Sequence, residues 1–364
     1  MDIDTIWYSY CPGPNAVGIA GHLNWLAEEF EPDGITVRTL ASSTADPREV
    51  RDAHQLVPKP ELFGNLFRHG GNPPPLVALS RGVDLRIVGL TWTEASRRVL
   101  TFQDSGIRTP EDLKGRRLSL PRRNGMAVDY LRSVTLRTYS EALAAAGLTF
   151  DDVELVEVAS EDARTTSVAP PRPQPLPYNA TLWSAWTNAG AQTDEALALA
   201  RGEVDVVASE HAQAANLQAT LKLHTVFDTR ELPSPAARAS GDQPLVLTVN
   251  GSLLDERPDI VERWLRRSLE AAEWARRNRS EARRFVASDA GLPEDLIDTA
   301  YSAEVDEQLG IDLDERSIAG LQVQHDHLLA HGFFEGDGFE VERFIDGGPL
   351  EAARDKLAAA PAAA

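Results

Sequence analysis

Cys11 is the only cysteine in this 364-residue sequence, and its surroundings are suited to chemistry. It directly follows a predicted strand over residues 5–9 and precedes the turn residues 12–14, Pro-Gly-Pro, which hold a chain in a sharp bend. A helix predicted over residues 15–30 begins next to the thiol, and its N-terminus would favour the thiolate and lower the thiol pKa. The alternative interpretation is a buried, inert cysteine that acts as a small apolar residue.

His54 and Arg68 are candidate partners for this thiol. Arg68 opens the run Arg-His-Gly-Gly, in which Gly70 and Gly71 let backbone N–H groups come close to a ligand. A guanidinium can bind a carboxylate, sulfinate or sulfonate through two hydrogen bonds, and a glycine N–H can add an oxyanion donor. His54 can serve as a base if the fold brings it within reach of the sulfur. Taken singly, Arg68 could equally form a surface salt bridge and His54 could be a solvated helix residue.

The other residue patterns give little support for a metal or a cofactor. His327 and His331 lie four residues apart on a predicted helix, but no carboxylate or cysteine has the spacing that completes a tetrahedral site, so we expect no metal. Phosphate-binding glycine motifs and the G-x-S-x-G motif are absent from the sequence, and we expect no cofactor. Trp183 and Trp186 are candidates to line a ligand cleft from the second half of the chain.

Strands and helices alternate along the chain, which predicts an α/β protein with mostly parallel sheets. The predicted strands cover residues 35–40, 84–90, 117–120, 153–158, 204–208, 225–229 and 244–250, and the further helices cover 76–81, 126–146, 194–201, 258–278 and 280–287. Trp264 and Trp274 fall on an amphipathic helix and are predicted core residues. Ligands of such sheets bind at the carboxyl ends of the strands, which is where Cys11 lies.

The chain is too long for one ordinary core, and the pattern changes near residue 106, where Thr109 caps a short helix with Pro110 at its first position. We therefore predict two α/β lobes around a cleft, with two crossovers between them. Residues 1–105 and 226–364 form lobe one, which carries the Cys, His and Arg residues, and residues 106–225 form lobe two. Hinged lobes of this kind close around ligands. Residues 165–177 carry five prolines and are predicted to form an exposed loop or lid.

Composition and charge narrow the classes of partner. The sequence has 56 Asp and Glu residues against 36 Lys and Arg, for a formal net charge of −20, which would repel nucleic-acid phosphates and anionic lipid surfaces. The first ten residues lack the pattern of an export signal, and no window is apolar enough to span a membrane. Because a single cysteine cannot form an intrachain disulfide, we expect a cytoplasmic protein. We also expect a monomer, without nucleic-acid or membrane partners.

Two sets of motifs resemble known families. Residues 8–16, His54, and the run Arg-His-Gly-Gly at 68–71 followed by Pro74 and Pro75 resemble the aromatic sulfinate desulfinases that act on 2'-hydroxybiphenyl-2-sulfinate. Residues 109–117, 151–155 and 201–205 resemble the sulfonate- and nitrate-binding proteins of ABC importers, which belong to the same superfamily. The resemblance covers nearly the whole chain and implies a fold of the type II periplasmic-binding-protein kind.

The resemblance to the desulfinases also implies roles. Cys11 would be the reactive thiol and His54 its partner, and Arg68 would clamp the sulfinate oxygens with the backbone N–H of Gly71. Ser9 and Gly70 would line the same site. The family chemistry cleaves an aryl C–S bond without cofactor or metal and yields the arene and sulfite, with either protonation of carbon or attack of the thiolate on sulfur as the leading step.

The implied activity is therefore that of a desulfinase acting on an aryl or other hydrophobic sulfinate, a small anionic molecule. Tyr10 and Gly13 replace the Asn and Val that flank the cysteine in the desulfinases, so the substrate can differ. A solute-binding protein for a sulfonate, nitrate or pyrimidine would share the fold, but it would ordinarily carry an export signal and would not need the cysteine. The pyrimidine-precursor synthase of thiamin biosynthesis is similar in fold but relies on a cysteine-rich motif and pyridoxal phosphate.

Overall fold

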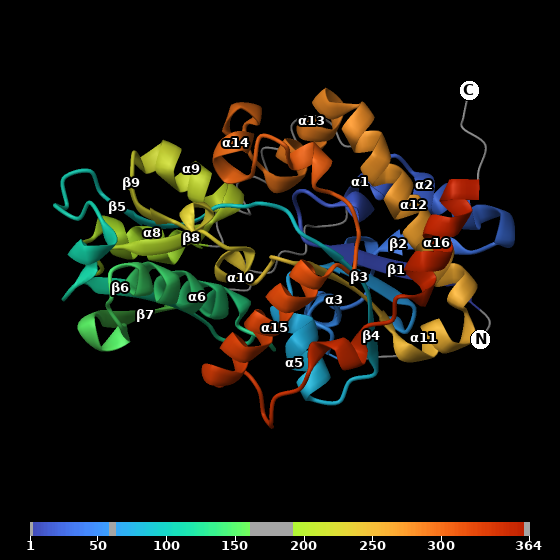
Figure 1. Ribbon diagram of the computed structural model, residues 1–364, viewed down its shortest axis with the longest axis horizontal. Helices are drawn as coiled ribbons and strands as arrows, with labels where there is room; N and C mark the ends of the chain where they lie inside the picture. Colours follow the sequence, from blue (N-terminus) through green and yellow to red (C-terminus); the bar gives the residue numbers. More distant parts are fainter. Residues whose placement is uncertain (1–2, 58–62, 161–191, 360–364) are drawn as a thin grey trace.

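The computed structural model describes residues 3–57, 63–160 and 192–359 and shows two groups of strands and helices side by side along the long axis (Figure 1). The first group is built on a five-stranded sheet. Its strands are β1 (Thr5–Tyr10), β2 (Thr36–Thr39), β3 (Leu66–Gly70), β4 (Leu85–Thr91) and β10 (Leu245–Asn250), in the order β2-β1-β3-β10-β4. β1 runs parallel to β2 and β3, and only β10 is antiparallel to its neighbours β3 and β4, so this sheet is mostly parallel, as predicted.

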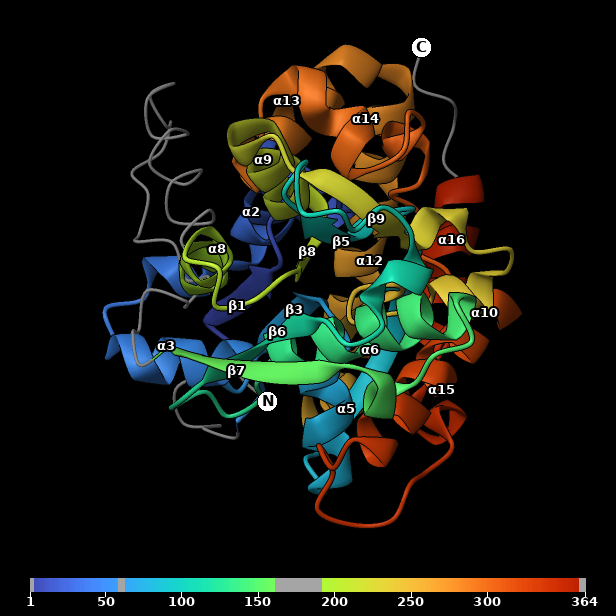
Figure 2. The ribbon, with the colours of Figure 1, turned by 90° about the vertical axis from the view of Figure 1, so that its left-hand side faces the viewer.

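Helices cover both faces of this sheet, and α12 and α5 lie on opposite sides of it (Figure 2). One face carries α1 (Ala16–His22), α2 (Trp25–Phe30), α11 (Gly251–Glu256), α12 (Pro258–Arg277) and α16 (Gly348–Ala359). The other face carries α3 (Pro47–His54), α5 (Pro73–Ser80) and α15 (Glu315–Ala330). Because both faces are covered, the residues of the central strands β3 and β10 are buried almost throughout rather than alternating between buried and exposed.

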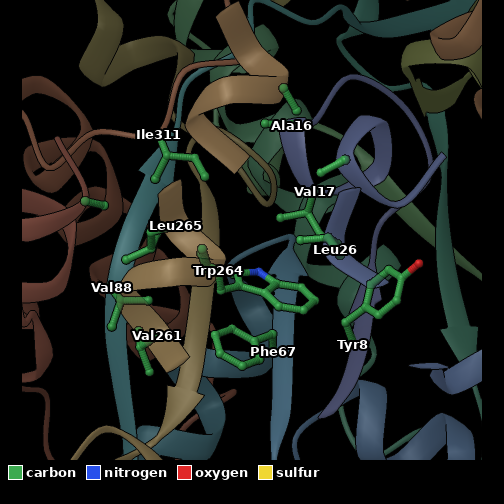
Figure 3. Close-up of a cluster of buried hydrophobic side chains, with 14 of the residues drawn as sticks. Tyr8, Ala16, Val17, Leu26, Phe67, Val88, Val261, Trp264, Leu265 and Ile311 are labelled. Carbon is green, nitrogen blue, oxygen red and sulfur yellow. The ribbon is translucent and has the colours of Figure 1, made fainter. Parts of the chain in front are cut away.

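Trp264 is a core residue, as predicted, in the apolar cluster between the five-stranded sheet and α12. Its indole is fully buried and stacks on Phe67 of β3, with ring centroids 4.3 Å apart (Figure 3). Trp274, on the same helix, is partly buried against the same cluster. The helix predicted over residues 15–30 is in fact two helices, because Asn24 adopts a left-handed conformation with φ 63° and interrupts the helical conformation between α1 and α2. Asparagine tolerates this conformation better than most residues.

The second group contains two smaller sheets. β5 (Arg97–Thr101) is antiparallel to β8 (Val207–Glu210) and to β9 (His224–Asp228), and β6 (Arg117–Arg123) is parallel to β7 (Glu154–Ser160). An isolated bridge between Leu118 and Val206 connects the two sheets. The associated helices are α6 (Tyr130–Ala145), α8 (Thr193–Ala200) and α9 (His211–Leu221). α10 (Pro235–Arg238) lies between β9 and β10 and contacts α15, and α13 (Arg279–Ala290) and α14 (Ile297–Ala300) follow later in the chain.

The strand pairing bears on where the chain crosses between the two groups. β5 precedes the predicted boundary at residue 105, yet it pairs with β8 and β9 of the second group. The first crossing therefore lies between β4 and β5, and the return lies between β9 and β10. The division into lobe one and lobe two stays a prediction, and these names are used below for the two groups. None of the helices in the described part of the chain has the length and apolar character that crossing a membrane requires.

Candidate active site

A cavity of about 180 Å³ lies between the two lobes. Lobe one contributes Cys11, His54, Arg68 and Gly71 to its wall, and lobe two contributes residues of α6 and α9 together with Glu210. Many other lining residues are apolar, including Pro12, Pro14, Pro73, Pro74, Met126, Val134, Leu245 and Ala290. The cavity therefore combines an apolar body with a polar end, which is the usual form of a site for a small organic ligand.

Cys11 lies directly after β1, at the carboxyl end of the sheet where the sequence places it. Its N–H donates to the carbonyl of His69 at 3.0 Å, and the side chain of Asn15 donates to the Cys11 carbonyl at 3.0 Å. The N–H of Gly13, at φ 127°, donates to Asp289 at 2.7 Å. These bonds fix the turn that presents the half-buried thiol.

The two glycines after Arg68 shape the space around the sulfur. A Cβ on Gly70 would lie 2.5 Å from Sγ of Cys11, so only glycine leaves room for the thiol at this position. The N–H of Gly71 points at the same sulfur, with N and Sγ 3.4 Å apart. Gly71 lines the cavity, whereas Gly70 is not among its lining residues and acts by admitting the thiol.

His54 and Arg68 meet beside Cys11. Nε2 of His54, at the end of α3, lies 4.0 Å from Sγ of Cys11. Arg68, on β3, is 1% exposed and donates from Nε to the His54 carbonyl at 2.9 Å and from Nη1 to the Gly71 carbonyl at 2.8 Å. The structure thus brings Cys11, His54, Arg68 and Gly71 together at one end of the cavity. The interpretation of Arg68 as a surface salt bridge is excluded by its burial.

Arg68 has no carboxylate partner among the residues that the structure describes. Its two hydrogen bonds go to neutral backbone carbonyls, and Nη2 carries no hydrogen bond to the described chain. A buried cation without a counter-ion is costly, because desolvation removes its favourable interaction with water. An anionic ligand at the cavity end would supply the missing charge.

Burial sets the protonation states at this end of the cavity. Burial, with the charge of Arg68, lowers the pKa of His54 to about 3, and the same two causes lower the pKa of His69 to about 3. Burial raises the pKa of Cys11, although Arg68 and the Gly71 N–H act in the opposite direction. This differs from the predicted lowering of the thiol pKa by a helix N-terminus, because α1 begins only at Ala16 and the loss of water around the sulfur dominates.

A second polar group on the cavity wall was not found from the sequence. Glu210, His211 and Asp242 each place one oxygen or nitrogen atom within 4.8 Å of the others. Asp242 forms an ion pair with the fully buried Arg97, and its other oxygen lies 2.9 Å from Nε2 of His211. This set does not fit a resident metal ion, because Arg97 already supplies the charge that neutralises Asp242. Glu210 ends β8, which pairs antiparallel with β5, so the carboxyl-end rule for parallel sheets that located Cys11 does not extend to this position.

The remaining predicted residues lie elsewhere. Ser9 is in β1 opposite Arg68 in the strand register, but it is not among the cavity-lining residues, and its buried hydroxyl has no hydrogen-bond partner in the described chain. Nε2 of His327 lies 3.0 Å from the Ser133 carbonyl, at the contact of α15 with α6. No hydrogen bond between His327 and a carboxylate occurs in the described ranges. Trp183, Trp186 and the proline-rich stretch 165–177 lie outside the described residues.

Comparison with known proteins places this geometry in context. A family model described as NMT1/THI5 like matches residues 72–168. The 2'-hydroxybiphenyl-2-sulfinate desulfinase of Rhodococcus erythropolis is 28% identical over an alignment of 356 residues, which covers 91% of this chain and 89% of the relative.

Two solved structures show the same fold. A crystal structure of a cysteine-to-serine mutant of the desulfurization enzyme DszB, in complex with biphenyl-2-sulfinic acid, has a TM-score of 0.73 at 22% identity and covers 98% of this chain and 100% of that one. The periplasmic aliphatic sulphonate binding protein SsuA of Escherichia coli has a TM-score of 0.63 at 16% identity, with 95% of this chain and 92% of that one covered. The chain therefore has the two-lobed α/β architecture of the type II periplasmic-binding fold, and the predicted resemblance to the 2'-hydroxybiphenyl-2-sulfinate desulfinases is confirmed over nearly its full length.

Proposed function

We propose that this chain is a cysteine-dependent desulfinase that cleaves the C–S bond of an aryl or other hydrophobic sulfinate and releases sulfite. The observation that carries the proposal is the buried guanidinium of Arg68, which has no carboxylate partner in the described chain and lies beside the Cys11 thiol. An anion is the ligand that such a cation lacks. The apolar cavity wall suits the hydrophobic part of the substrate, and the desulfinase relative supports the sulfinate as the anionic part.

The charges around the thiol favour protonation of carbon as the leading step. Because burial raises its pKa, Cys11 is a thiol at neutral pH and can donate its proton to the carbon that carries the sulfur. The C–S bond then breaks, the arene leaves with the new C–H bond, and the sulfur leaves as sulfur dioxide. One water adds to sulfur dioxide to give hydrogen sulfite, and the proton released returns to the thiolate through the neutral imidazole of His54. The sum is sulfinate plus water giving arene plus hydrogen sulfite.

Arg68 would bind the sulfinate while this happens, and Gly71 would support the sulfur of Cys11. Nη2 of Arg68 would hold a sulfinate oxygen, and the bonds from Nε and Nη1 to the carbonyls of His54 and Gly71 fix the plane of the guanidinium. The N–H of Gly71 interacts with the sulfur of Cys11 and supports negative charge there after the proton has left. No step requires a metal or an organic cofactor.

Release of sulfite from defined sulfinates tests the proposal. Purified protein is incubated with benzenesulfinate, biphenyl-2-sulfinate and methanesulfinate, and sulfite is quantified by ion chromatography, which does not depend on thiols. We expect sulfite from the aryl compounds, none with Cys11→Ser, and normal turnover with Arg86→Ala, a control on β4 outside the cavity. Circular dichroism and thermal melting check that Cys11→Ser remains folded.

Two results would overturn the proposal. Sulfite release that persists in Cys11→Ser would remove the thiol from the reaction. Saturable binding of sulfonates or sulfinates without any sulfite would instead favour a solute-binding function, which SsuA, with the same fold, illustrates.

A further inference from the structure

Gln55 directly follows His54 and crosses from lobe one to lobe two. Its side chain is 4% exposed. Oε1 accepts hydrogen bonds from the N–H groups of Ala127 at 2.9 Å and Val128 at 3.4 Å, and Nε2 donates to the Val128 carbonyl at 3.0 Å. A side-chain amide offers an acceptor and donors together, so Gln55 meets the backbone of lobe two as a neighbouring strand would.

The end of helix α3, which carries His54, adopts a conformation that needs support. Leu56 has φ 60°, in the left-handed region that is unfavourable for a residue with a branched side chain. The N–H of Leu56 donates to the Ala53 carbonyl at 3.0 Å, and Leu56 is itself buried. The burial of the Leu56 side chain and the hydrogen bonds of Gln55 stabilise this conformation of the helix end.

The segment that Gln55 contacts is joined to the wall of the cavity. Residues 127–128 lead into α6, whose Tyr130 and Val134 line the cavity. Asp129 accepts from the N–H groups of Arg132 at 3.2 Å and Arg123 at 2.7 Å, so the segment is fixed to both α6 and β6. A movement of lobe two relative to lobe one therefore acts on Gln55.

His54, at the same end of the helix, also contacts Arg68, the proposed binding group for the anion. Its carbonyl accepts from Nε of Arg68 at 2.9 Å, and its imidazole lies 4.0 Å from the Cys11 sulfur. The imidazole that faces the thiol and the contact with lobe two therefore belong to adjacent residues. Both Gln55 and His54 line the cavity.

We infer that Gln55 is a positioning residue, whose contact with residues 127–128 forms as the lobes close on a ligand and holds His54 against Cys11. The inference rests on the proposed function for its link to turnover, but not for its link to closure. The bonds from Gln55 join the end of α3 to this segment, and in an open state water replaces them. Closure would thereby assemble the site in the same step that removes water from it.

The expected consequence is a split between binding and turnover. Without the Gln55 contact a smaller fraction of the protein is closed, and the apparent affinity falls by that fraction. Loss of this set of hydrogen bonds corresponds to a rise of about 5- to 30-fold in KM for an aryl sulfinate. The value of kcat at saturation stays within about twofold, because a saturating ligand restores closure.

Alkylation of the thiol tests closure without requiring turnover. Cys11 is the only thiol, so the rate of its reaction with iodoacetamide reports its accessibility directly. Rates are measured with increasing benzenesulfinate for wild type, Gln55→Ala, Gln55→Glu and the control Gln103→Ala, an exposed glutamine of lobe two. Gln55→Glu keeps the shape and the acceptor but loses the donor to Val128, so we expect an effect in the same direction if Gln55→Ala does not fold.

We expect both Gln55 variants to alkylate faster than wild type without ligand and to need about 5- to 30-fold more benzenesulfinate for half protection, while Gln103→Ala matches wild type. Equal alkylation rates and equal half-protection concentrations in wild type and the Gln55 variants would overturn the inference, even if the variants melt at lower temperature. If the shift occurs but wild type releases no sulfite, the proposed function fails and the closure contact stands. If sulfite is released and KM is unchanged in the Gln55 variants, the proposed function stands and the closure contact fails.

Discussion

A methyl group at Gly70 would crowd the reactive sulfur directly. β3 and β1 are neighbouring parallel strands, and a Cβ on Gly70 would lie 2.5 Å from Sγ of Cys11 and 3.3 Å from Nη2 of Arg68. The backbone of Gly70 is not in the left-handed region, so alanine can adopt its conformation. Any effect of Gly70→Ala therefore comes from the close approach to the thiol and the guanidinium.

The size of the effect follows from these distances. Nonbonded heavy atoms settle about 3.5–4.0 Å apart, so the sulfur of Cys11 must move by about 1 Å or more. That movement disturbs the 3.4 Å contact with the Gly71 N–H and the 4.0 Å contact with His54. A misplacement of about 1 Å costs about 100-fold in rate, and overpacking costs about 1–3 kcal/mol in the free energy of unfolding. We expect kcat/KM for sulfite release to fall about 100-fold in Gly70→Ala.

The assay separates this loss from general destabilisation. Initial rates of sulfite release are measured well below the melting temperature and are normalised to folded protein. Gly89→Ala is the matched control, because its Cβ would crowd Ile311 in the core rather than Cys11. We expect both variants to melt earlier and only Gly70→Ala to lose activity. Full kcat/KM in a Gly70→Ala protein that melts as early as Gly89→Ala would refute the assignment of the reaction to this thiol.

Three further predictions concern charge and protonation. Arg68→Lys keeps a positive charge but loses the planar fork that donates to two carbonyls, so we expect KM for benzenesulfinate to rise about 10-fold or more in steady-state kinetics. Because the pKa of His54 is near 3 and burial raises that of Cys11, we expect kcat/KM to be constant from about pH 5 to pH 8 and to fall at higher pH as the thiol loses the proton it donates; a rise there would favour attack by the thiolate on sulfur. Glu195→Ala removes the carboxylate whose two oxygens both accept from Nη2 of the buried Arg123 of lobe two. We expect the free energy of unfolding to fall by about 3–5 kcal/mol in thermal or denaturant unfolding, whereas an exposed glutamate of the same lobe would tolerate the change.

Strands with ordinary apolar patterns could be predicted from the sequence, and strands with buried charge could not. Residues 5–9 and 244–250 read as strands because β-formers dominate them, and β1 and β10 occupy nearly those ranges. β3 and β5 were missed because Arg68, Arg97 and Arg98 interrupt their apolar runs. Each of these arginines is buried, and the carboxylates of Asp242 and Asp228 that pair with Arg97 and Arg98 are far away in the sequence. Such a strand is recognisable only when its distant partners are known.

The candidate site shows a similar division. The resemblance brought Cys11, His54, Arg68 and Gly71 together, and the structure places all of them on one cavity. The direction of the thiol pKa could not be predicted, because it depends on how much water surrounds the sulfur and not on the residues next to it in the chain. Gln55 carries no motif, and its role depends on hydrogen bonds to a segment more than seventy residues away.

The contacts around Cys11 are what distinguish a catalyst from a binding protein on this fold. A sulphonate-binding protein shares the fold and needs only a donor for the anion, a role that Arg68 would fill in either case. Gly70 leaves room for a sulfur atom, the Gly71 N–H points at that sulfur, and His54 stays neutral beside it, none of which contributes to holding an anion. A binding protein would gain nothing from these three features. Weaker binding of the anion in Arg68→Lys would therefore be expected under both functions. Loss of sulfite release in Gly70→Ala, with ligand still protecting Cys11 from alkylation, would be expected only of an enzyme.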